Sequence, residues 1–560
     1  MEAMEGSLSS MTRRFTVKKS IICFIAVSTV VVFAVIIFSK NKHPSDFDIC
    51  SEVSPKLRLL RSAESSRCPD GIFLKGAVAA DSETCSVVGR DILKKGGSAV
   101  DAAIAALLCT SIVNPQSAGL GGGSIFTVMD SSGHVTIINS RETAPLNVIS
   151  DLKTKCGEPP NKNGMYWIGV PGEIRGYEKA HKLFGKLPWA DLFQWTIKRA
   201  REGIKVPRIQ GCYIQKISEN DSVRKAFTDE KGNLLKTGDI IKFEKLADTL
   251  ETIADDGAEA FYSGRIAEDL VRDVQEAGGV LTLEDLASYK VKVTDAWNIF
   301  IGDYQMYIPP PPSGGVLLGI VLNIMKGCSW IQTSDLWILS MYKMKCSIKK
   351  MFETGECCVL VTYTNIYPRV HHVGRDAKKI LDSSFAKEIW RKIKSNEGPK
   401  SQTKYEGGSG TTHLSVLDES GIAVSVTSSI NAFFGSRVYS RNTGIILNNQ
   451  LKDFCNITQN ISPGERPPSS MAPSILKSKS NLLVIGGSGG KMITTGLASA
   501  LLNLFWPGNS LKEAIDTPVL YVDPSEPNTT KLEYKFSMLS SCTPTEPSSH
   551  PISSFSHHLF

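Results

Sequence analysis

The feature that most constrains the fold is a β-hairpin pattern at residues 412–431, THLSVLDESGIAVSVTSSIN. Two runs of alternating apolar and polar residues flank Asp-Glu-Ser-Gly, a sequence typical of a turn between antiparallel strands. Because side chains alternate between the two faces of a strand, Leu414 and Val416 share one face of the predicted sheet. The opposite face then carries small polar side chains: Thr411, His413 and Ser415 on the first strand, and Ser425, Thr427, Ser429 and Asn431 on the second.

This polar face has two interpretations. Small hydroxyl groups favour a polar pocket, because a solvent-exposed face would more often carry lysine, glutamate or other long side chains. Threonine and serine are also common residues of ordinary strands. The pattern therefore predicts a sheet with one apolar face and leaves the role of the polar face open.

The start of the hairpin raises a chemical question. Residues 407–415, GGSGTTHLS, place flexible glycines directly before the first strand. A loop that leads into a hairpin is one interpretation, and cleavage of the chain between Gly410 and Thr411 is the other. A threonine hydroxyl is a poor nucleophile without an adjacent base, whereas an N-terminal threonine has its own α-amine as that base. Glycine before the bond admits the strained backbone angles that self-cleavage needs, although Gly-Thr pairs are common.

The rest of the chain predicts an α+β fold. Helices and strands come in mixed runs and not as regular βαβ units, which favours α+β layering over a doubly wound sheet. The periodicity predicts a helix at 98–110, strands at 119–130 and 134–145 around an Asp-Ser-Ser-Gly turn, amphipathic helices at 173–202 and 244–277, and a strand running into a polyproline turn at 302–315.

Residues 481–506 predict a buried strand, a glycine turn and a long apolar helix. A Walker A phosphate loop needs glycine, four residues and then Gly-Lys-Ser/Thr. The sequence GGSGGKM has a different spacing and places Met492 where the hydroxyl residue belongs, which argues against nucleotide binding. The backbone N–H groups at the start of the helix would suit an anion or an oxyanion, and a plain tight turn is the alternative.

The N-terminal segment predicts a membrane anchor. Residues 20–39 are twenty consecutive residues without a charge, long enough to span a bilayer as a helix. Basic residues before this span favour a cytoplasmic tail at 1–19, and a polar stalk follows at 40–75. We therefore expect a single-pass type II protein of the plasma membrane with the remainder outside the cell. A cleaved signal peptide is the alternative.

Composition excludes some classes of function and supports a secretory route. A net charge of +7 over 560 residues comes without a compact basic-aromatic motif, which argues against nucleic acid as a partner. The cysteines and histidines show no metal-ligand spacing, and the HExxH motif is absent. Glycosylation acceptors of the form Asn-X-Ser/Thr occur at Asn220, Asn456, Asn460 and Asn528.

With these residues in view, the chain resembles the gamma-glutamyltransferases, the glutathione hydrolase proenzymes, and within them the type 5, leukotriene C4-cleaving branch. The resemblance covers residues 76–328 and 375–537, and its motifs are specific because they come as an ordered set. They are GRDILKKGGSAVDAAIAALLCTSIVNPQSAGLGGGSIFT, INSRETAP, WIGVPGEIRGYEKAHKLFGKLPWADLFQ, PPPPSGG, GTTHLSV, FFGSRVYSRNTGIILNN, PPSSMAPSI and VIGGSGG.

The resemblance implies an N-terminal-nucleophile hydrolase fold, a four-layer αββα sandwich of two stacked sheets with helices outside. It also implies a precursor that cuts itself between Gly410 and Thr411, so that Thr411 is the nucleophile. The large-subunit part of the catalytic domain would be residues 76–410 and the small-subunit part 411–537, joined as a heterodimer. The catalytic domain would then be extracellular, and no metal or organic cofactor is required.

The same motifs imply roles for individual residues. Arg141 would pair with the α-carboxylate of a γ-glutamyl group, a bidentate role suited to arginine. Asp453 would hold the α-ammonium of that group, and Thr412 would support the site beside Thr411. The other implied residues are the substrate contacts Ser429, Asn431, Gln450, Ser469, Ser470 and Met471, the oxyanion N–H pair of Gly489 and Gly490, and a disulfide between Cys85 and Cys109.

The implied reaction is acyl transfer. Thr411 attacks the γ-glutamyl amide of glutathione or of a glutathione conjugate, including leukotriene C4, and forms a γ-glutamyl-threonine ester. Water, or an acceptor amino acid or dipeptide, then resolves the ester.

The chain departs from the family pattern at three places. Gln450 replaces a usual glutamate, which keeps a hydrogen bond and loses a charge, so weaker binding of the substrate ammonium is expected. Residues 329–374 resemble nothing in the family, and residues 538–560 form a Ser/Pro-rich tail that is predicted to be disordered. The alternative function is therefore an uncleaved, inactive, membrane-anchored isoform that acts as a binding ectodomain.

Overall fold

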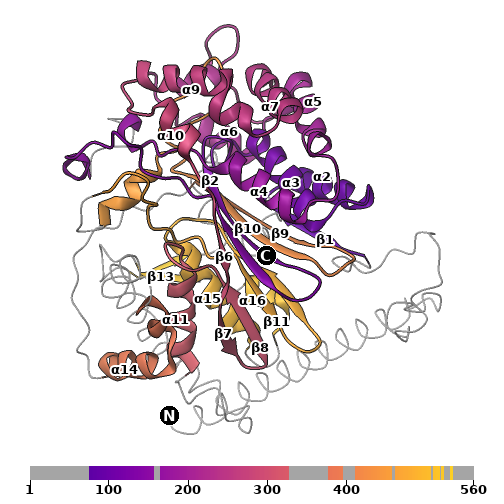
Figure 1. The fold of residues 1–560 in the computed structure, drawn as a ribbon, viewed down its shortest axis with the longest axis vertical. Helices are drawn as coiled ribbons and strands as arrows, with labels where there is room; N and C mark the ends of the chain where they lie inside the picture. The colour runs from indigo at the N-terminus through magenta and orange to yellow at the C-terminus, as the bar shows by residue number, and fades with distance from the viewer. Residues whose placement is uncertain are drawn as a thin grey trace, which may run out of the picture. The chain divides into compact units, whose positions relative to one another are not determined.

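The hairpin pattern forms the centre of a six-stranded antiparallel sheet (Figure 1). Its strands, β9 (Gly410–Leu417) and β10 (Ala423–Asn431), pair so that Ser429 lies opposite Thr411. The predicted turn forms because the Asp418 carboxylate accepts hydrogen bonds from the backbone N–H groups of Ser420 and Ile422. The strand order is β1-β9-β10-β2-β3-β6, completed by β1 (Ala77–Ala80), β2 (Gly123–Met129), β3 (Val135–Asn139) and β6 (Lys292–Asp295).

The computed structural model describes residues 75–156, 164–326, 376–394, 410–456, 461–505, 509–516, 519–522 and 530–533, all within the unit Leu74–Phe560. The predicted anchor at 20–39, the atypical segment at 329–374, the tail at 538–560 and two glycosylation acceptors, Asn460 and Asn528, lie outside these residues. Among the residues that are described, no helix is long and apolar enough to cross a membrane. The acceptor Asn220 lies exposed in a turn.

A second, four-stranded antiparallel sheet faces the first. Helices cover the outer faces of both sheets, so the described residues form a helix–sheet–sheet–helix sandwich, as expected (Figure 1). The second sheet has the order β12 (Leu482–Ile485), β11 (Ser474–Lys477), β8 (Tyr304–Ile308) and β7 (Trp297–Ile301). The covering helices include α3 (Ala99–Val113) and α4 (Glu173–Phe184) on the first sheet, and α11 (Gly315–Lys326) and α15 (Met492–Phe505) on the second.

The remaining helices surround these layers. They are α2 (Glu83–Lys94), α5 (Gln194–Glu202), α6 (Arg208–Ile214), α7 (Glu244–Asp256), α8 (Glu259–Ser263), α9 (Arg265–Glu276), α10 (Leu283–Ser288), α14 (Ser383–Lys394) and α16 (Leu511–Asp516). Short 3-10 helices are η1 (Leu152–Lys155), η2 (Gly164–Trp167), η3 (Trp189–Leu192), η4 (Ser222–Phe227), η7 (Asp376–Leu381) and η8 (Gln450–Asn456). Two strand pairs stand apart, β4 (Ile204–Lys205) with β5 (Ile240–Ile241) and β13 (Val519–Val522) with β14 (Thr530–Glu533).

The sequence predicted long amphipathic helices at 173–202 and 244–277, and this prediction is wrong because both segments are interrupted. The first ends at α4, turns through Gly185 and Pro188, and resumes as α5. Proline cannot continue a helix, because it lacks the N–H donor and clashes with the preceding turn. The second is interrupted at Gly257, whose φ of 81° is the left-handed conformation that ends α7. The apolar residues recur at helical spacing on both sides of each break. The periodicity therefore predicts the helices correctly but does not reveal where each one ends.

Most of the polar face of the hairpin lies in the interface between the two sheets. The interpretation of this face as a pocket is therefore wrong for most of its length. The Ser425 hydroxyl donates to the Ile485 carbonyl at 2.9 Å, and the Ser415 hydroxyl donates to the Val484 carbonyl at 3.3 Å, both on β12. His413 is fully buried, and burial lowers its pKa to about 3, so its ring is neutral. A Cβ on Gly486 would lie 2.0 Å from that ring, so the sheets meet too closely for a larger residue.

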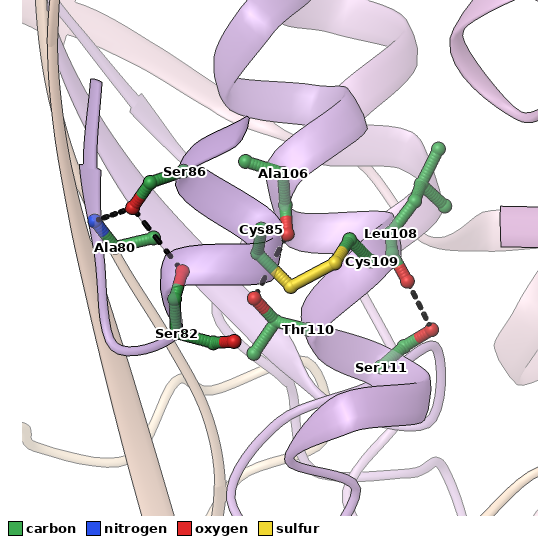
Figure 2. Close-up of a disulfide and its surroundings, with 9 residues drawn as sticks. All are labelled: Ala80, Ser82, Cys85, Ser86, Ala106, Leu108, Cys109, Thr110 and Ser111. Carbon is green, nitrogen blue, oxygen red and sulfur yellow. Dashed lines mark hydrogen bonds between the residues drawn. A yellow bond between two sulfur atoms is a disulfide. The ribbon is translucent and has the colours of Figure 1, made fainter. Parts of the chain in front are cut away.

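Two disulfides are formed within the described residues. Figure 2 shows the one that joins Cys85 of α2 to Cys109 of α3, the pairing that the family resemblance implied. The other joins Cys156, after η1, to Cys455 in η8, at a sequence separation of 299. The first holds two neighbouring helices together, and the second connects segments far apart in sequence.

Candidate active site

A pocket opens at the Thr411 end of the hairpin. Of the polar face, Thr411, Ser429 and Asn431 reach this pocket, because a bulge between Ser429 and Asn431 ends the regular pairing there. Asn431 has a φ of 75°, a conformation that is uncommon for asparagine and is concentrated at functional sites. The other lining residues are Arg141, Gln450, Asp453, Ser469, Ser470, Met471, Gly490, Lys491 and Ile493.

Thr411 lies in an unbroken strand, bonded to Gly410, so the structure is that of the uncleaved chain. The Ser429 hydroxyl donates to the Gly410 carbonyl at 2.8 Å and lies 3.1 Å from the Thr411 hydroxyl. Because the single Ser429 proton goes to the carbonyl, the Thr411 hydroxyl is the donor in the second contact. Ser429 therefore connects the threonine hydroxyl to the carbonyl of the bond that would be cut.

Gly410 occupies a position that admits no side chain. A Cβ there would lie 2.5 Å from the Ala432 carbonyl oxygen and 2.9 Å from that of Gln116. Both contacts are shorter than van der Waals contact and involve backbone, which cannot move aside cheaply. The glycine before Thr411 is thus required by packing as well as by backbone flexibility.

Thr412 does not line the pocket, so its hydroxyl does not support the site directly, and the supporting role implied for its backbone stays a prediction. Alternation turns its side chain to the other face of β9, where its hydroxyl donates to the Asp81 carboxylate at 2.6 Å. Asp81 directly follows β1, the neighbour of β9 in the sheet. This contact fixes β9 one residue after the proposed scission point and was not foreseen from the sequence.

Arg141 and Asp453 form a buried ion pair at the base of the pocket. Arg141 is 1% exposed, and its Nη2 lies 2.6 Å from an Asp453 carboxylate oxygen. The guanidinium also donates to the carbonyls of Pro467 and Pro468, at 2.9 and 2.7 Å. Gln450, one turn before Asp453 in η8, donates its amide to the same Asp453 oxygen at 2.8 Å. These contacts hold the charged groups in fixed positions.

Two polar atoms of this cluster are left for a ligand. Within the described residues, Nη1 of Arg141 is a buried donor without a hydrogen-bond partner, and Oε1 of Gln450 is a buried acceptor without one. Buried polar groups are nearly always hydrogen-bonded, so each such exception needs a reason. An unpaired guanidinium donor suits a carboxylate, and an unpaired amide oxygen beside the Asp453 carboxylate suits an ammonium group. Together they match the carboxylate and ammonium of an amino acid.

The glycine turn directly precedes α15 and reaches the pocket. Gly489 and Gly490 have φ values of 112° and 59°, left-handed conformations that favour glycine. Gly490 lines the pocket, whereas Gly489, the residue before it in sequence, does not line it. Ser469 keeps its segment in place through its hydroxyl, which accepts from the backbone N–H of Met471 at 3.0 Å. The structure thus places Gly490 in the lining of the same pocket as Thr411.

Burial raises the pKa of the Glu142 carboxyl, which follows Arg141, to about 8, although the Arg141 charge acts in the opposite direction. Glu142 is fully buried, and neither of its carboxylate oxygens has a hydrogen-bond partner among the described residues. Glu173 is equally buried, and burial raises its pKa to about 7. Near neutral pH the Glu142 carboxyl is therefore mainly protonated, whereas the Glu173 carboxyl is about half protonated.

This burial predicts a pH dependence of stability. Because the folded-state pKa of Glu142 lies above its ordinary value of 4.5, the folded chain binds more protons than the unfolded chain between pH 4.5 and about 8. The free energy of unfolding should therefore fall as the pH rises through this window. Glu142→Gln, which cannot ionise, should flatten that fall in urea-unfolding curves, whereas Glu230→Gln on the surface should not. An unchanged slope in Glu142→Gln would contradict this assignment.

The comparisons with known proteins agree on one family. The family model described as Gamma-glutamyltranspeptidase matches residues 85–540. The "Glutathione hydrolase 5 proenzyme" of Mus musculus is 41% identical over 492 residues, covering 83% of this chain and 85% of that relative, and that of Homo sapiens is 38% identical over 513 residues, covering 83% and 86%.

Solved structures give the same result for the fold. The cephalosporin acylase from Bacillus halodurans aligns with a TM-score of 0.68 and 25% identity, over 82% of this chain and 87% of that one. The gamma-glutamyltranspeptidase of Helicobacter pylori aligns with a TM-score of 0.50 and 25% identity, over 58% of this chain and 93% of that one. The cephalosporin acylase therefore shares the sandwich fold described above over most of its chain, and the gamma-glutamyltranspeptidase aligns with it over 58% of this chain.

Proposed function

Because this chain belongs to the gamma-glutamyltranspeptidase family, we propose that it is a self-cleaving precursor that hydrolyses glutathione and related γ-glutamyl amides. Thr411 is the nucleophile in both reactions. The observation that supports the proposal most strongly is the placement of the Thr411 hydroxyl in one pocket with the unpaired Arg141 donor and the unpaired Gln450 acceptor. This pocket can hold both ends of an α-amino acid group beside a nucleophile.

Self-cleavage begins with attack of the Thr411 hydroxyl oxygen on the Gly410 carbonyl carbon. The hydrogen bond from Ser429 polarises this carbonyl and stabilises the charge that develops on its oxygen. The bond from the Gly410 carbon to the Thr411 nitrogen breaks, the nitrogen takes a proton, and an ester joins Gly410 to the Thr411 oxygen. Water hydrolyses this ester, which leaves a carboxylate on Gly410 and a free α-amine on Thr411.

The new α-amine then serves as the general base for substrate turnover. It takes the proton of the Thr411 hydroxyl as that oxygen attacks the γ-carbonyl of the donor, and it returns the proton to the leaving amine. Backbone N–H groups of the glycine turn at Gly489 and Gly490 stabilise the oxyanion. Water hydrolyses the γ-glutamyl-threonine ester, or an acceptor amine takes the acyl group.

Substrate specificity follows from what the pocket holds. Arg141 binds the α-carboxylate, while Asp453 and Gln450 bind the α-ammonium, with Ser469, Ser470 and Met471 along the carboxylate side. Both groups are free in a γ-linked glutamyl amide. In an α-linked isomer the α-carboxylate is consumed in the amide bond. The remaining γ-carboxylate lies farther from the α-ammonium, so the guanidinium has no carboxylate on the same carbon atom as the ammonium to bind.

This difference provides the test. Purified protein is incubated with the γ-glutamyl and the α-glutamyl anilides of p-nitroaniline, and release of the chromophore is followed. We expect hydrolysis of the γ-linked compound only, and release of glutamate from glutathione. Equal cleavage of both isomers, or cleavage of neither, would overturn the proposal, and the latter result together with an uncut chain would favour the inactive binding ectodomain.

Further parts of the proposal rest on the sequence. Leukotriene C4 is included among the conjugates, and amino acids or dipeptides are included as acceptors. The subunits are residues 1–410 and 411–560, and the protein is anchored in the plasma membrane by residues 20–39 with its catalytic domain outside the cell. Glycosylation at the four acceptor asparagines is consistent with that location.

A further inference from the structure

The disulfide between Cys156 and Cys455 spans the proposed scission point. Cys156 precedes Thr411 in the chain and Cys455 follows it, so each product of self-cleavage would carry one half of the bond. The disulfide between Cys85 and Cys109, by contrast, lies wholly before Thr411 and cannot join the products. The Cys156–Cys455 bond is therefore placed to keep the two products covalently linked.

Cys455 lies in η8, the short helix that carries two of the residues proposed to bind the substrate ammonium. In a 3-10 helix, residues three apart lie on the same face. Gln450 and Asp453 therefore share the face that lines the pocket. Leu451 and Phe454 share another face, which packs in an apolar cluster. A shift or rotation of η8 would thus move both substrate contacts together.

The apolar cluster against η8 is built from both sides of the scission point. Its buried members come from η8 and from the chain before Gly410, namely Ala144, Leu152, Trp167, Leu451 and Phe454. Cys156 and Cys455 pack against this cluster and are partly exposed. The disulfide therefore adds a covalent bond at a place where η8 and the first product otherwise meet through noncovalent contacts.

The two ends of η8 are held in different ways. Just before its start, the Asn448 side chain donates to the carbonyls of Gly121 and Gly169 at 2.7 and 2.8 Å. Near its end, the disulfide joins Cys455 to the segment that follows η1. A helix of seven residues has little stability of its own, so its attachments to the rest of the protein decide its orientation.

We infer that the Cys156–Cys455 disulfide joins the two products and positions η8 for substrate binding. The inference rests on the proposed function, because it requires cleavage before Thr411. Opening the bond frees the end of η8, so part of its backbone must be ordered again when the substrate ammonium binds. KM should rise about fivefold, which equals about 1 kcal/mol, the low end of the cost of ordering one residue's backbone. The value of kcat should change little, because the Thr411 hydroxyl keeps its own contacts.

Gel electrophoresis under denaturing conditions tests the covalent link, because noncovalent contacts do not survive denaturation. Wild-type protein should migrate as one band without reductant and as two bands with it. Cys156→Ser/Cys455→Ser should give two bands without reductant, whereas Cys85→Ser/Cys109→Ser, the matched control, should give one. Mass spectrometry of an unreduced tryptic digest of the wild type should show the peptides of Cys156 and Cys455 linked to each other.

Kinetics with γ-glutamyl anilide test the positioning role. Cys156→Ser/Cys455→Ser should raise KM about fivefold with kcat nearly unchanged, and Cys85→Ser/Cys109→Ser should keep the wild-type KM. Dithiothreitol provides a second test without substitution, since it should raise the KM of the native wild type and have no further effect on Cys156→Ser/Cys455→Ser. Cys85 and Cys109 are fully buried, so the reagent reaches the partly exposed Cys156–Cys455 bond first.

The possible outcomes separate this inference from the proposed function. Two unreduced wild-type bands, or one unreduced band in Cys156→Ser/Cys455→Ser, would overturn the covalent link. An unchanged KM after loss of the bond, or a fall in kcat alone, would overturn the positioning role while γ-glutamyl anilide is still cleaved. A wild type that stays one band even with reductant would overturn self-cleavage, and this inference with it.

Discussion

Ser429→Ala is expected to slow cleavage of the Gly410–Thr411 bond by about 100-fold or more, the usual effect of removing one oxyanion donor. The Ser429 hydroxyl is the group that donates to the Gly410 carbonyl, and it also accepts from the Thr411 hydroxyl. Alanine leaves the nucleophile and the scissile bond in place but removes the hydrogen bond between them. The full-length chain should accumulate, and its slow conversion can be followed on a reducing gel.

Two further variants of β10 make this test specific. Ser429→Thr keeps a hydroxyl at the same Cβ and should restore cleavage. Ser425→Ala also removes a buried hydroxyl from β10, but that hydroxyl donates to the Ile485 carbonyl between the sheets. It should lower the melting temperature and leave the cleavage rate nearly unchanged. Equal rates in the wild type and Ser429→Ala would show that the hydrogen bond is not part of the reaction.

Arg141→Gln is expected to lower kcat/KM for γ-glutamyl substrates by about 100-fold or more, because removing one partner of a buried, hydrogen-bonded charge pair typically weakens binding by about 2–5 kcal/mol. The substitution removes the donor that was left for the substrate carboxylate. It also leaves the Asp453 carboxylate buried without its cation, although burial already raises the pKa of Asp453 above its ordinary value. Arg141→Lys should recover only part of the activity, because an ammonium cannot reproduce the planar set of donors that binds Asp453 and the Pro467 and Pro468 carbonyls and leaves Nη1 for the substrate.

Two further variants separate the effect of the ion pair on stability from its effect on substrate binding. Arg141→Gln/Asp453→Asn removes both charges, so it should recover much of the lost melting temperature while remaining inactive. Arg437→Gln breaks a different pair, in which Nη1 lies 2.5 Å from the Asp221 carboxylate, outside the pocket lining. It should cost stability and leave kcat/KM within about twofold. A double variant as active as the wild type would contradict the proposed role of this pair.

The sequence predicted the elements that depend on local pattern. The alternation around Asp418 predicted the hairpin and which of its side chains share a face, and the apolar spacing predicted α3. It failed where a tertiary contact decides the outcome. The hydroxyls of Ser415 and Ser425 bind the backbone of β12, and nothing in their own strand specifies that a second sheet lies there.

The residues of the candidate site also fall into two groups, those that a local sequence pattern predicts and those that only the fold reveals. The family motifs named most of the residues that line the pocket, because those motifs are contiguous in sequence. The contact of Thr412 with Asp81 spans 331 residues, and the Cys156–Cys455 disulfide spans 299, so no local pattern could reveal either one. Lys491 belongs to the glycine turn in sequence, but only the fold reveals that it lines the same pocket as Arg141 and Asp453.

The central claim is that this chain cuts itself before Thr411. The most direct measurement is the intact mass of the reduced, deglycosylated protein, combined with the N-terminal sequence of the smaller product. The account predicts two products, one that ends at Gly410 and one that begins Thr-Thr-His-Leu-Ser, and a single uncut chain for Thr411→Ala. A wild-type protein that remains one chain of full-length mass, or that is cut at another bond, would contradict it.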